Sequence, residues 1–220
     1  MKLDDIKDKI PKNLYNSLLP DVEEFRPCQE KSIKAGLLDR KNLLVCTPTA
    51  SGKTLIAELA MVKYILEDRG KAIYIVPLKA LANEKFKDFK KRYGIYLRTA
   101  LSIGDFDSAD SYLAGYDLIV CTAEKLDSLI RHHAPWLSKV ATVIVDEVHL
   151  MNDPGRGPTL EILITMLREL LENVQIIALS ATIGNPEELS EWLDANLIID
   201  NWRPVELKKG IFYKGELEFE

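Results

Sequence analysis

An eight-residue segment near residue 50 has glycine, lysine and threonine in consecutive positions, shortly after an apolar run at 43–46. The segment is Thr47-Pro48-Thr49-Ala50-Ser51-Gly52-Lys53-Thr54. A triphosphate needs several backbone N–H groups aimed at one point, and a helix N-terminus supplies them with a favourable dipole. Gly52 lets the backbone close around a phosphate, Lys53 would bridge the β- and γ-phosphates, and the Thr54 hydroxyl would bind Mg²⁺. The segment therefore predicts a site for ATP and Mg²⁺.

The match covers only the end of the generic phosphate-loop pattern, because Thr47 stands where the pattern has its first glycine. A Gly-Lys-Thr turn that merely opens a helix is the alternative interpretation. If the loop binds ATP, its nucleotide-binding residues are Pro48, Thr49, Ala50, Ser51, Gly52, Lys53 and Thr54.

Two adjacent acids, Asp146 and Glu147, come directly after a second apolar run at 142–145, and His149 follows them. A carboxylate at a strand end beside a phosphate loop is where such enzymes hold Mg²⁺, so Asp146 is the predicted metal residue, acting through water. Glu147 would orient and deprotonate the attacking water. These acids and Lys53 are the predicted catalytic residues. Alone, two acids after a strand are most often a solvated loop.

A third element, Ser180-Ala181-Thr182, follows the apolar run 175–179. By itself it is typical of a helix cap. From average residue usage, the joint chance of the three patterns in one chain of this length is on the order of 10⁻⁴. Coincidence is therefore a poor explanation, and the combination argues against other phosphate-loop enzymes such as kinases or transporter ATPases.

The elements that must position these residues alternate along the chain. Short apolar runs, which read as strands buried on both faces, lie at Asn42–Cys46, Ala72–Val76, Tyr96–Leu101, Leu118–Cys121, Thr142–Val145, Gln175–Leu179 and Leu197–Ile199. Amphipathic helical patterns separate them, at Thr54–Glu67, Lys79–Arg92, Glu124–His132, Pro158–Leu171 and Pro186–Leu193. This alternation predicts an α/β fold of three layers around a mostly parallel sheet. Ligands of such sheets bind at the carboxyl ends of the strands, which is where each motif falls.

The two ends of the chain differ from this pattern. We expect a helical extension at residues 1–24, the α/β domain at 25–205, and an extended segment at 206–220 that leads onward. Asp4–Ser17 is a polar helical pattern, and Pro27 opens a second helix. Because the alternation continues to residue 220 without a stop signal, we expect the chain to be part of a longer protein.

Composition narrows the class of protein. The chain has 220 residues, of which 47% are hydrophobic and 29% charged, which is ordinary globular usage. A net charge of −5 argues against a broadly basic surface that coats nucleic acid. No segment approaches the ~18 consecutive apolar residues of a membrane span, and the acidic N-terminus does not fit a signal peptide. Cys28, Cys46 and Cys121 are expected to be reduced in a cytoplasmic protein.

The motifs resemble those of DExH-type superfamily 2 helicases, in which residues 49–54, 146–149 and 180–182 match motifs I, II and III. Residues 25–29 are similar to the Q-motif and residues 77–84 to motif Ia. Residues 103–105 are similar to the short glycine motif and residues 122–127 to motif Ib. Residues 155–161 and 203–207 point to the Ski-two-like group, and within it to the archaeal Hjm-type DNA repair helicases. The resemblance extends from Phe25 to the C-terminus.

The resemblance implies a RecA-like domain, the first of two, that couples ATP hydrolysis to 3′→5′ movement on a nucleic-acid strand. The second domain would supply arginine fingers, worth 10³–10⁵ in the rate of phosphoryl transfer. We find no motif that would carry these arginine fingers. Gly155-Arg156-Gly157 is superficially similar to such a motif, but it follows motif II directly and therefore lies in the wrong place. We therefore predict that this chain alone binds ATP weakly and hydrolyses it negligibly.

The resemblance also assigns roles to residues. Gln29 would read the adenine edge, and His149, Ser180 and Thr182 would couple the nucleotide to movement. Contacts with the nucleic-acid strand would come from Lys79, Ala80, Gly104, Asp105, Thr122 and Glu124. The basic run from Lys85 to Arg92 either adds to these contacts or is an ordinary solvated helix face. We interpret Trp192 as a core residue and leave the role of Trp136 open.

Two alternatives remain beside a DNA helicase acting on single-stranded or forked DNA in repair and fork processing. The strand could be RNA, because the group includes helicases of both kinds. The chain could also be a stand-alone ATP-binding module, although such a module would not need the water-activating Glu147. The oligomeric state stays open.

Overall fold

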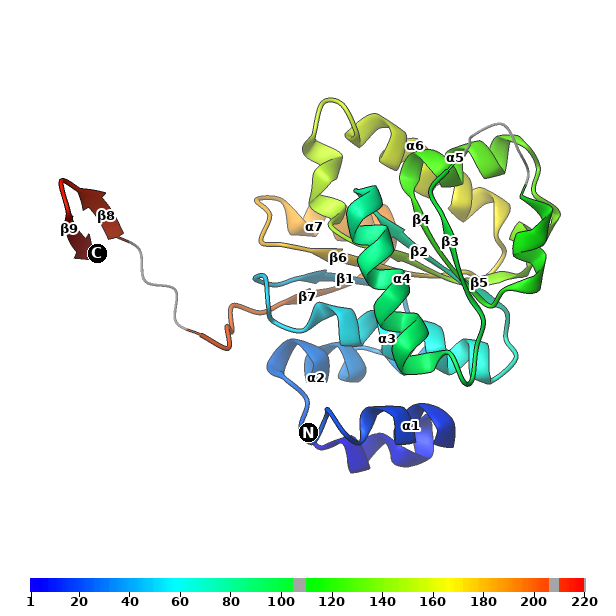
Figure 1. Ribbon diagram of the computed structural model, residues 1–220, viewed down its shortest axis with the longest axis horizontal. Coiled ribbons are helices and arrows are strands. Elements are labelled where there is room, and N and C mark those ends of the chain that lie inside the picture. Colours follow the sequence, from blue (N-terminus) through cyan, green and yellow to red (C-terminus); the bar gives the residue numbers. More distant parts are fainter. Residues whose placement is uncertain (105–109, 206–209, 220) are drawn as a thin grey trace.

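The computed structural model describes residues 1–104, 110–205 and 210–219. Its centre is a parallel sheet of seven strands in the order β3-β4-β2-β5-β6-β1-β7 (Figure 1). The strands are β1 (Leu43–Cys46), β2 (Lys71–Val76), β3 (Thr99–Ser102), β4 (Leu118–Thr122), β5 (Val140–Val145), β6 (Gln175–Ser180) and β7 (Asn196–Ile199). All seven match runs predicted from the sequence, although the predicted strand at 96–101 begins only at Thr99.

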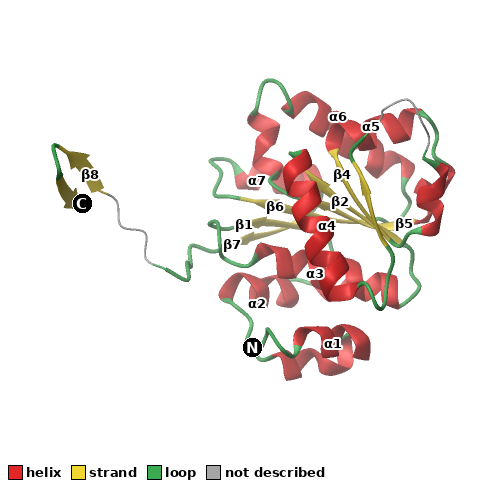
Figure 2. Cartoon of the chain, viewed as in Figure 1, coloured by secondary structure: helices red, strands yellow, loops and turns green. Residues whose placement is uncertain are grey.

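Helices cover both faces of the sheet (Figure 2). The α-helices are α1 (Lys12–Leu18), α2 (Pro27–Lys34), α3 (Lys53–Leu66), α4 (Lys79–Tyr93), α5 (Ala123–Arg131), α6 (Gly157–Leu170) and α7 (Pro186–Leu193). Short 3₁₀ helices lie at Leu3–Lys9, Leu37–Asp39, Ser111–Gly115, Pro135–Lys139 and Val148–Asn152. The three-layer α/β architecture predicted from the alternation is confirmed.

Two apolar clusters, one on each face, explain why the strands are apolar throughout. Successive residues of β1 point to opposite faces, so Leu43 and Val45 join the cluster under α1 to α4. Leu44 and Cys46 join the other cluster, under α5 to α7. Trp136 is 2% exposed in this second cluster, so it is a core residue and offers no surface for stacking.

The N-terminal segment packs on the face formed by α1 to α4. The predicted helix at 4–17 is divided into a 3₁₀ helix and α1, because Pro11 stands at the N-cap of α1 and has no N–H to continue the preceding turn. Leu3, Ile6 and Leu14 are buried in the same cluster as α3. The segment therefore shares a core with the α/β domain.

The last described residues form an antiparallel hairpin, β8 (Gly210–Tyr213) and β9 (Glu216–Phe219). Its turn residues Lys214 and Gly215 both have positive φ, 49° and 91°, as expected for a two-residue hairpin turn. Within the region predicted to be extended, residues 210–213 and 216–219 are strands. Within the described part of the chain, no helix is long and apolar enough to cross a membrane.

Candidate nucleotide-binding site

The parallel sheet brings the predicted motifs that lie at the ends of its strands to one edge, because the carboxyl ends of parallel strands lie together. We call the segments at the carboxyl ends of β1, β5 and β6 the P-loop half; they are residues 47–54, 146–149 and 180–182. We call the segments at the carboxyl ends of β2, β3 and β4 the distal half; its described residues are 77–80, 103–104 and 122–124. Since β5, β6 and β1 are neighbours in the sheet, the P-loop half is contiguous.

The P-loop is held from outside by the first turn of α2. Three side chains donate hydrogen bonds to three consecutive loop carbonyls: Arg26 Nη1 to Ala50 O at 2.7 Å, Cys28 Sγ to Ser51 O at 3.4 Å, and Gln29 Nε2 to Gly52 O at 2.9 Å. In a planar trans peptide the C=O and the following N–H point in opposite directions. Holding the carbonyls therefore turns the amides that follow them away from α2, as a phosphate cradle requires.

The backbone of the loop needs special conformations. Ala50 and Gly52 have φ of 64° and 94°, in the left-handed region. A Cβ added to Gly52 would lie 2.5 Å from Gln29 Nε2, so a side chain here would be strained and would also collide with the residue that holds the loop. The buried hydroxyls of Thr47 and Ser51 lie 2.7 Å apart and close the loop from inside.

Lys53 folds along the loop. Its ammonium donates to the carbonyls of Thr47 at 2.8 Å and Pro48 at 3.1 Å. Burial lowers the pKa of Lys53 below its usual value, while the nearby charges of Glu147 and Asp146 partly offset that shift. The structure thus brings the predicted lysine and the two predicted acids within electrostatic reach of one another.

Asp146 is held in place by a residue that sequence reasoning missed. Its Oδ2 accepts a hydrogen bond from the Tyr74 hydroxyl at 2.7 Å, and its Oδ1 accepts one from the Glu147 amide at 3.1 Å. Tyr74 is fully buried on β2 and packs edge-to-face on Phe89. Burial, and then the charge of Asp146, raise the pKa of Tyr74 well above its usual value, so the phenol keeps its proton and donates. The available signal in the sequence was the hydroxyl of Tyr74, which stands alone in the otherwise aliphatic run 72–76.

His149 links the acids to the segment after β6. Its Nδ1 lies 3.4 Å from Glu147 Oε2 and also 3.4 Å from the Ala181 amide nitrogen. A neutral ring with its lone pair on Nδ1 accepts from Ala181, whereas a protonated ring donates to Glu147. Glu147 itself has a φ of 54°, a conformation that costs energy in a residue other than glycine. The segments that contain Asp146 and Ser180 are therefore in contact through His149 and Ala181.

The segment after β6 presents its two hydroxyl residues differently. Ser180 is fully buried and its carbonyl accepts a hydrogen bond from the Thr47 amide at 3.2 Å, which ties β6 to the start of the P-loop. The Ser180 hydroxyl has no hydrogen-bond partner among the described residues. Thr182 is exposed. A coupling role for either residue stays a prediction.

The oxygen atoms at the P-loop half suit Mg²⁺. Thr54 supplies a hydroxyl and Asp146 a carboxylate, and Mg²⁺ prefers oxygen ligands and keeps several from water or phosphate. Within the described residues, no group of three or more His, Cys, Asp or Glu side chains could hold a metal alone. Thr54 Oγ1 also accepts a hydrogen bond from Lys85 Nζ at 3.1 Å.

Gln29 has a different environment from the one its predicted role suggests. It is 4% exposed, and its amide group donates to the Gly52 carbonyl while its Oε1 accepts from the Arg26 amide at 2.8 Å. The side chain therefore supports the P-loop directly. Reading of the adenine edge stays a prediction.

Most of the predicted residues of the distal half are exposed. Lys79, Ala80, Gly104 and Glu124 are exposed, and Asp105 lies outside the described residues. Thr122 is 3% exposed, and its hydroxyl caps α5 by accepting from the Lys125 amide at 3.4 Å. The hydroxyl of Thr122 thus has a structural role as a helix cap, and a strand contact from Thr122 stays a prediction.

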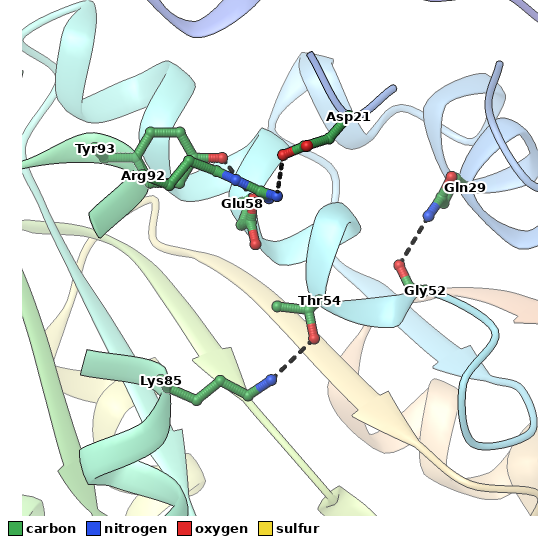
Figure 3. A network of polar contacts seen from close by, with 8 residues as sticks. All are labelled: Asp21, Gln29, Gly52, Thr54, Glu58, Lys85, Arg92 and Tyr93. Atoms are coloured by element: carbon green, nitrogen blue, oxygen red, sulfur yellow. Dashed lines mark hydrogen bonds and ion pairs between the residues drawn. The ribbon is translucent and has the colours of Figure 1, made fainter. Parts of the chain in front are cut away.

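The basic run on α4 divides into two sets. Lys87, Lys90 and Lys91 are exposed, as an ordinary solvated face would be. Lys85 and Arg92 instead turn toward α3 and make the polar contacts drawn in Figure 3. Each of the two sequence interpretations therefore misses part of the run.

Comparisons with known proteins agree with one another. The family model described as DEAD/DEAH box helicase matches residues 26–189. The chain is 58% identical over 205 residues to an ATP-dependent DNA helicase Hel308 of Methanocaldococcus jannaschii. This match covers 90% of this chain and 17% of the relative. It is 53% identical over 199 residues to the Pyrococcus abyssi protein of the same name, and this match covers 90% of this chain and 27% of that relative. The chain thus spans less than a third of these curated relatives.

Among solved structures, the chain is similar to the DUF1998 helicase MrfA bound to DNA and AMPPNP. The TM-score is 0.75 at 24% identity, and the match covers 88% of this chain and 30% of that chain. This likeness concerns the fold alone, and it confirms the predicted RecA-like α/β class.

Proposed function

We propose that this chain, which belongs to the DEAD/DEAH box helicase family, is the ATP-binding motor domain of a DNA helicase. Family membership confirms the resemblance to superfamily 2 helicases. The observation that supports an active nucleotide site best is the convergence at the P-loop half. There Lys53 lies in a preformed loop, within electrostatic reach of both Asp146 and Glu147.

The proposed roles follow from the geometry. Lys53 and the first amides of α3, which have no partners within the helix, bind the phosphates. The Thr54 hydroxyl and the Asp146 carboxylate would hold Mg²⁺, and Tyr74 fixes the orientation of that carboxylate. Mg²⁺, when bound, neutralises charge on the β- and γ-phosphate oxygens. Glu147 orients the attacking water and takes its proton.

We further propose that hydrolysis needs a second domain of the same parent chain, which would complete the site with arginine fingers. The relatives support this proposal, because this chain covers only 17% and 27% of the two described above. On this proposal residues 1–24 and 206–220 flank the motor domain at 25–205, and the chain alone binds ATP but turns it over negligibly.

For the substrate we propose single-stranded or forked DNA, with 3′→5′ movement in repair or fork processing and a cytoplasmic location. The names of the curated relatives, which are DNA helicases, favour DNA over RNA. The exposed Lys79, Ala80 and Gly104 of the distal half are suited to contacts with the phosphate backbone, which carry no sequence information.

Steady-state ATP hydrolysis tests this proposal. We expect negligible turnover from this chain with or without single-stranded DNA, and DNA-stimulated turnover from the full-length protein that contains it. Matched DNA and RNA strands of one sequence separate the two substrates. DNA-stimulated hydrolysis by this chain alone would contradict the need for a second domain, and stimulation by RNA alone would reverse the substrate.

A further inference from the structure

A second lysine, Lys85 of α4, reaches the predicted metal residue from outside the phosphate loop. Its ammonium donates to Thr54 Oγ1 at 3.1 Å, and its side chain is half-buried between α4 and α3 (Figure 3). No local pattern in the sequence separates this lysine from its neighbours in the basic run. Its contact joins the helix that begins at Lys79, in the distal half, to the first turn of α3, in the P-loop half.

The position of Lys85 is set by the packing of the two helices. Residues 85, 89 and 92 of α4 are spaced by four and three, so they share one helix face. Phe89 on this face is buried in the core. Lys85 is therefore directed at α3 by the same face that anchors α4.

A second polar contact holds the far end of this helix pair. Glu58, one turn beyond Thr54 on α3, is 5% exposed and accepts from Arg92 Nη1 at 2.7 Å and from the Tyr93 hydroxyl at 2.5 Å. Arg92 also donates to Asp21 at 2.7 Å (Figure 3). The C-terminal end of α4 is therefore anchored to α3.

The chemistry of Thr54 allows it to serve two cations. A threonine hydroxyl has two acceptor lone pairs and one donor proton. Lys85 uses one lone pair, which leaves the other for Mg²⁺. An ammonium on the same oxygen attracts the phosphates and repels the metal ion, so it changes the balance between nucleotide alone and nucleotide with Mg²⁺.

We propose that Lys85 is a positioning residue that connects the strand-binding helix α4 to the metal residue Thr54. It orients the Thr54 hydroxyl and adds positive charge beside the phosphates. Because it stands on the helix whose first turn carries Lys79 and Ala80, binding of a nucleic-acid strand and binding of Mg²⁺–nucleotide influence each other through it. This inference rests on the proposed function, since it assumes that the P-loop half binds nucleotide.

The experiment compares Lys85→Met with Lys87→Met, an exposed lysine on the same helix, in the full-length protein. The affinity for AMPPNP is measured with Mg²⁺ and with EDTA. We expect Lys85→Met to lower the metal-free affinity about threefold to tenfold, and to increase the gain in affinity on adding Mg²⁺ by a similar factor. Lys87→Met should behave as the wild type, and Lys85→Arg should restore most of the wild-type ratio.

The same proteins then give the effect of single-stranded DNA on AMPPNP affinity. Coupling between two sites is typically about 5–150-fold and reciprocal, and we expect Lys85→Met to bring it close to onefold without lowering the melting temperature. Unchanged metal dependence and unchanged coupling in Lys85→Met would overturn the inference. A wild-type protein that does not bind AMPPNP would instead refute the proposed function. If the wild type binds AMPPNP but shows no coupling to DNA, the connection to α4 is refuted as well.

Discussion

The two halves of the sheet edge are built in different ways. In the P-loop half, three parts of the site are held by neighbours far away in the sequence: the loop carbonyls by α2, Asp146 by Tyr74, and Thr54 by Lys85. In the distal half, Lys79, Ala80 and Gly104 are exposed. Phosphoryl transfer depends on prearranged charges, whereas gripping a phosphate backbone needs only accessible donors. We therefore expect substitutions in the first half to cost far more than those in the second.

The largest effect should come from Glu147→Gln. The amide cannot accept the proton of the attacking water, so we expect kcat in the full-length protein to fall about 10²–10⁴-fold. The affinity for AMPPNP should stay within about twofold, because the residue does not bind phosphate in our scheme. The control is DNA binding, which should not change. Retained hydrolysis would remove Glu147 from the role of catalytic base.

Lys53→Ala should come next. The ammonium lies in the loop on the carbonyls of Thr47 and Pro48, and hydrogen bonds to charged groups are worth about 1.5–3 kcal/mol. We expect AMPPNP affinity to fall about tenfold to a hundredfold and turnover to be lost with it. Calorimetric titration measures the affinity, with Lys87→Ala as a matched lysine outside the site. An unchanged affinity would contradict the phosphate-binding assignment.

Tyr74→Phe probes the support of the metal residue. The ring and its contact with Phe89 remain, so the free energy of unfolding should fall by only about 1 kcal/mol. The Asp146 carboxylate loses the hydrogen bond that orients it, and loss of such a contact typically lowers metal affinity about 10–100-fold. We expect a higher Mg²⁺ concentration for half-maximal hydrolysis, with unchanged DNA binding. An unaltered Mg²⁺ dependence would mean that Tyr74 serves the core alone.

These three substitutions also mark what the sequence could predict. Glu147 and Lys53 lie in short contiguous motifs after strands, so their types and order were sufficient. Tyr74 and Lys85 make contacts with residues 72 and 31 positions away, so no short motif marks them. The only local signal was the single hydroxyl of Tyr74 in an aliphatic run. The strands were predictable because a strand buried on both faces is apolar throughout. The division of the basic run was not, since it depends on how α4 packs against α3.

In the distal half, Lys79→Ala should have a small and uniform effect. We expect the affinity of the full-length protein for single-stranded DNA to fall severalfold, and the slope of log affinity against log salt to decrease by about 0.7. AMPPNP affinity without DNA should not change. Fluorescence anisotropy across a salt series, with strands of different sequence, measures both quantities. A loss confined to some sequences would point to base contacts and break the comparison between the two halves.

The smallest effect concerns two cysteines that sit at matched places, Cys46 on β1 in front of the P-loop and Cys121 on β4 in the distal half. Burial raises the pKa of Cys46 to about 11 and that of Cys121 to about 12. Only the thiolate reacts with iodoacetamide, and its fraction rises about tenfold per pH unit below these values. If both halves are equally closed, Cys46, whose pKa is raised less, should be alkylated faster than Cys121. Peptide mass spectrometry at pH 8 and 9 gives the two rates, with the unfolded chain as the reference for each site.

Faster modification of Cys121 would mean that the distal half opens locally more often than the P-loop half. Such opening is the behaviour expected of the region that must adapt to a passing strand.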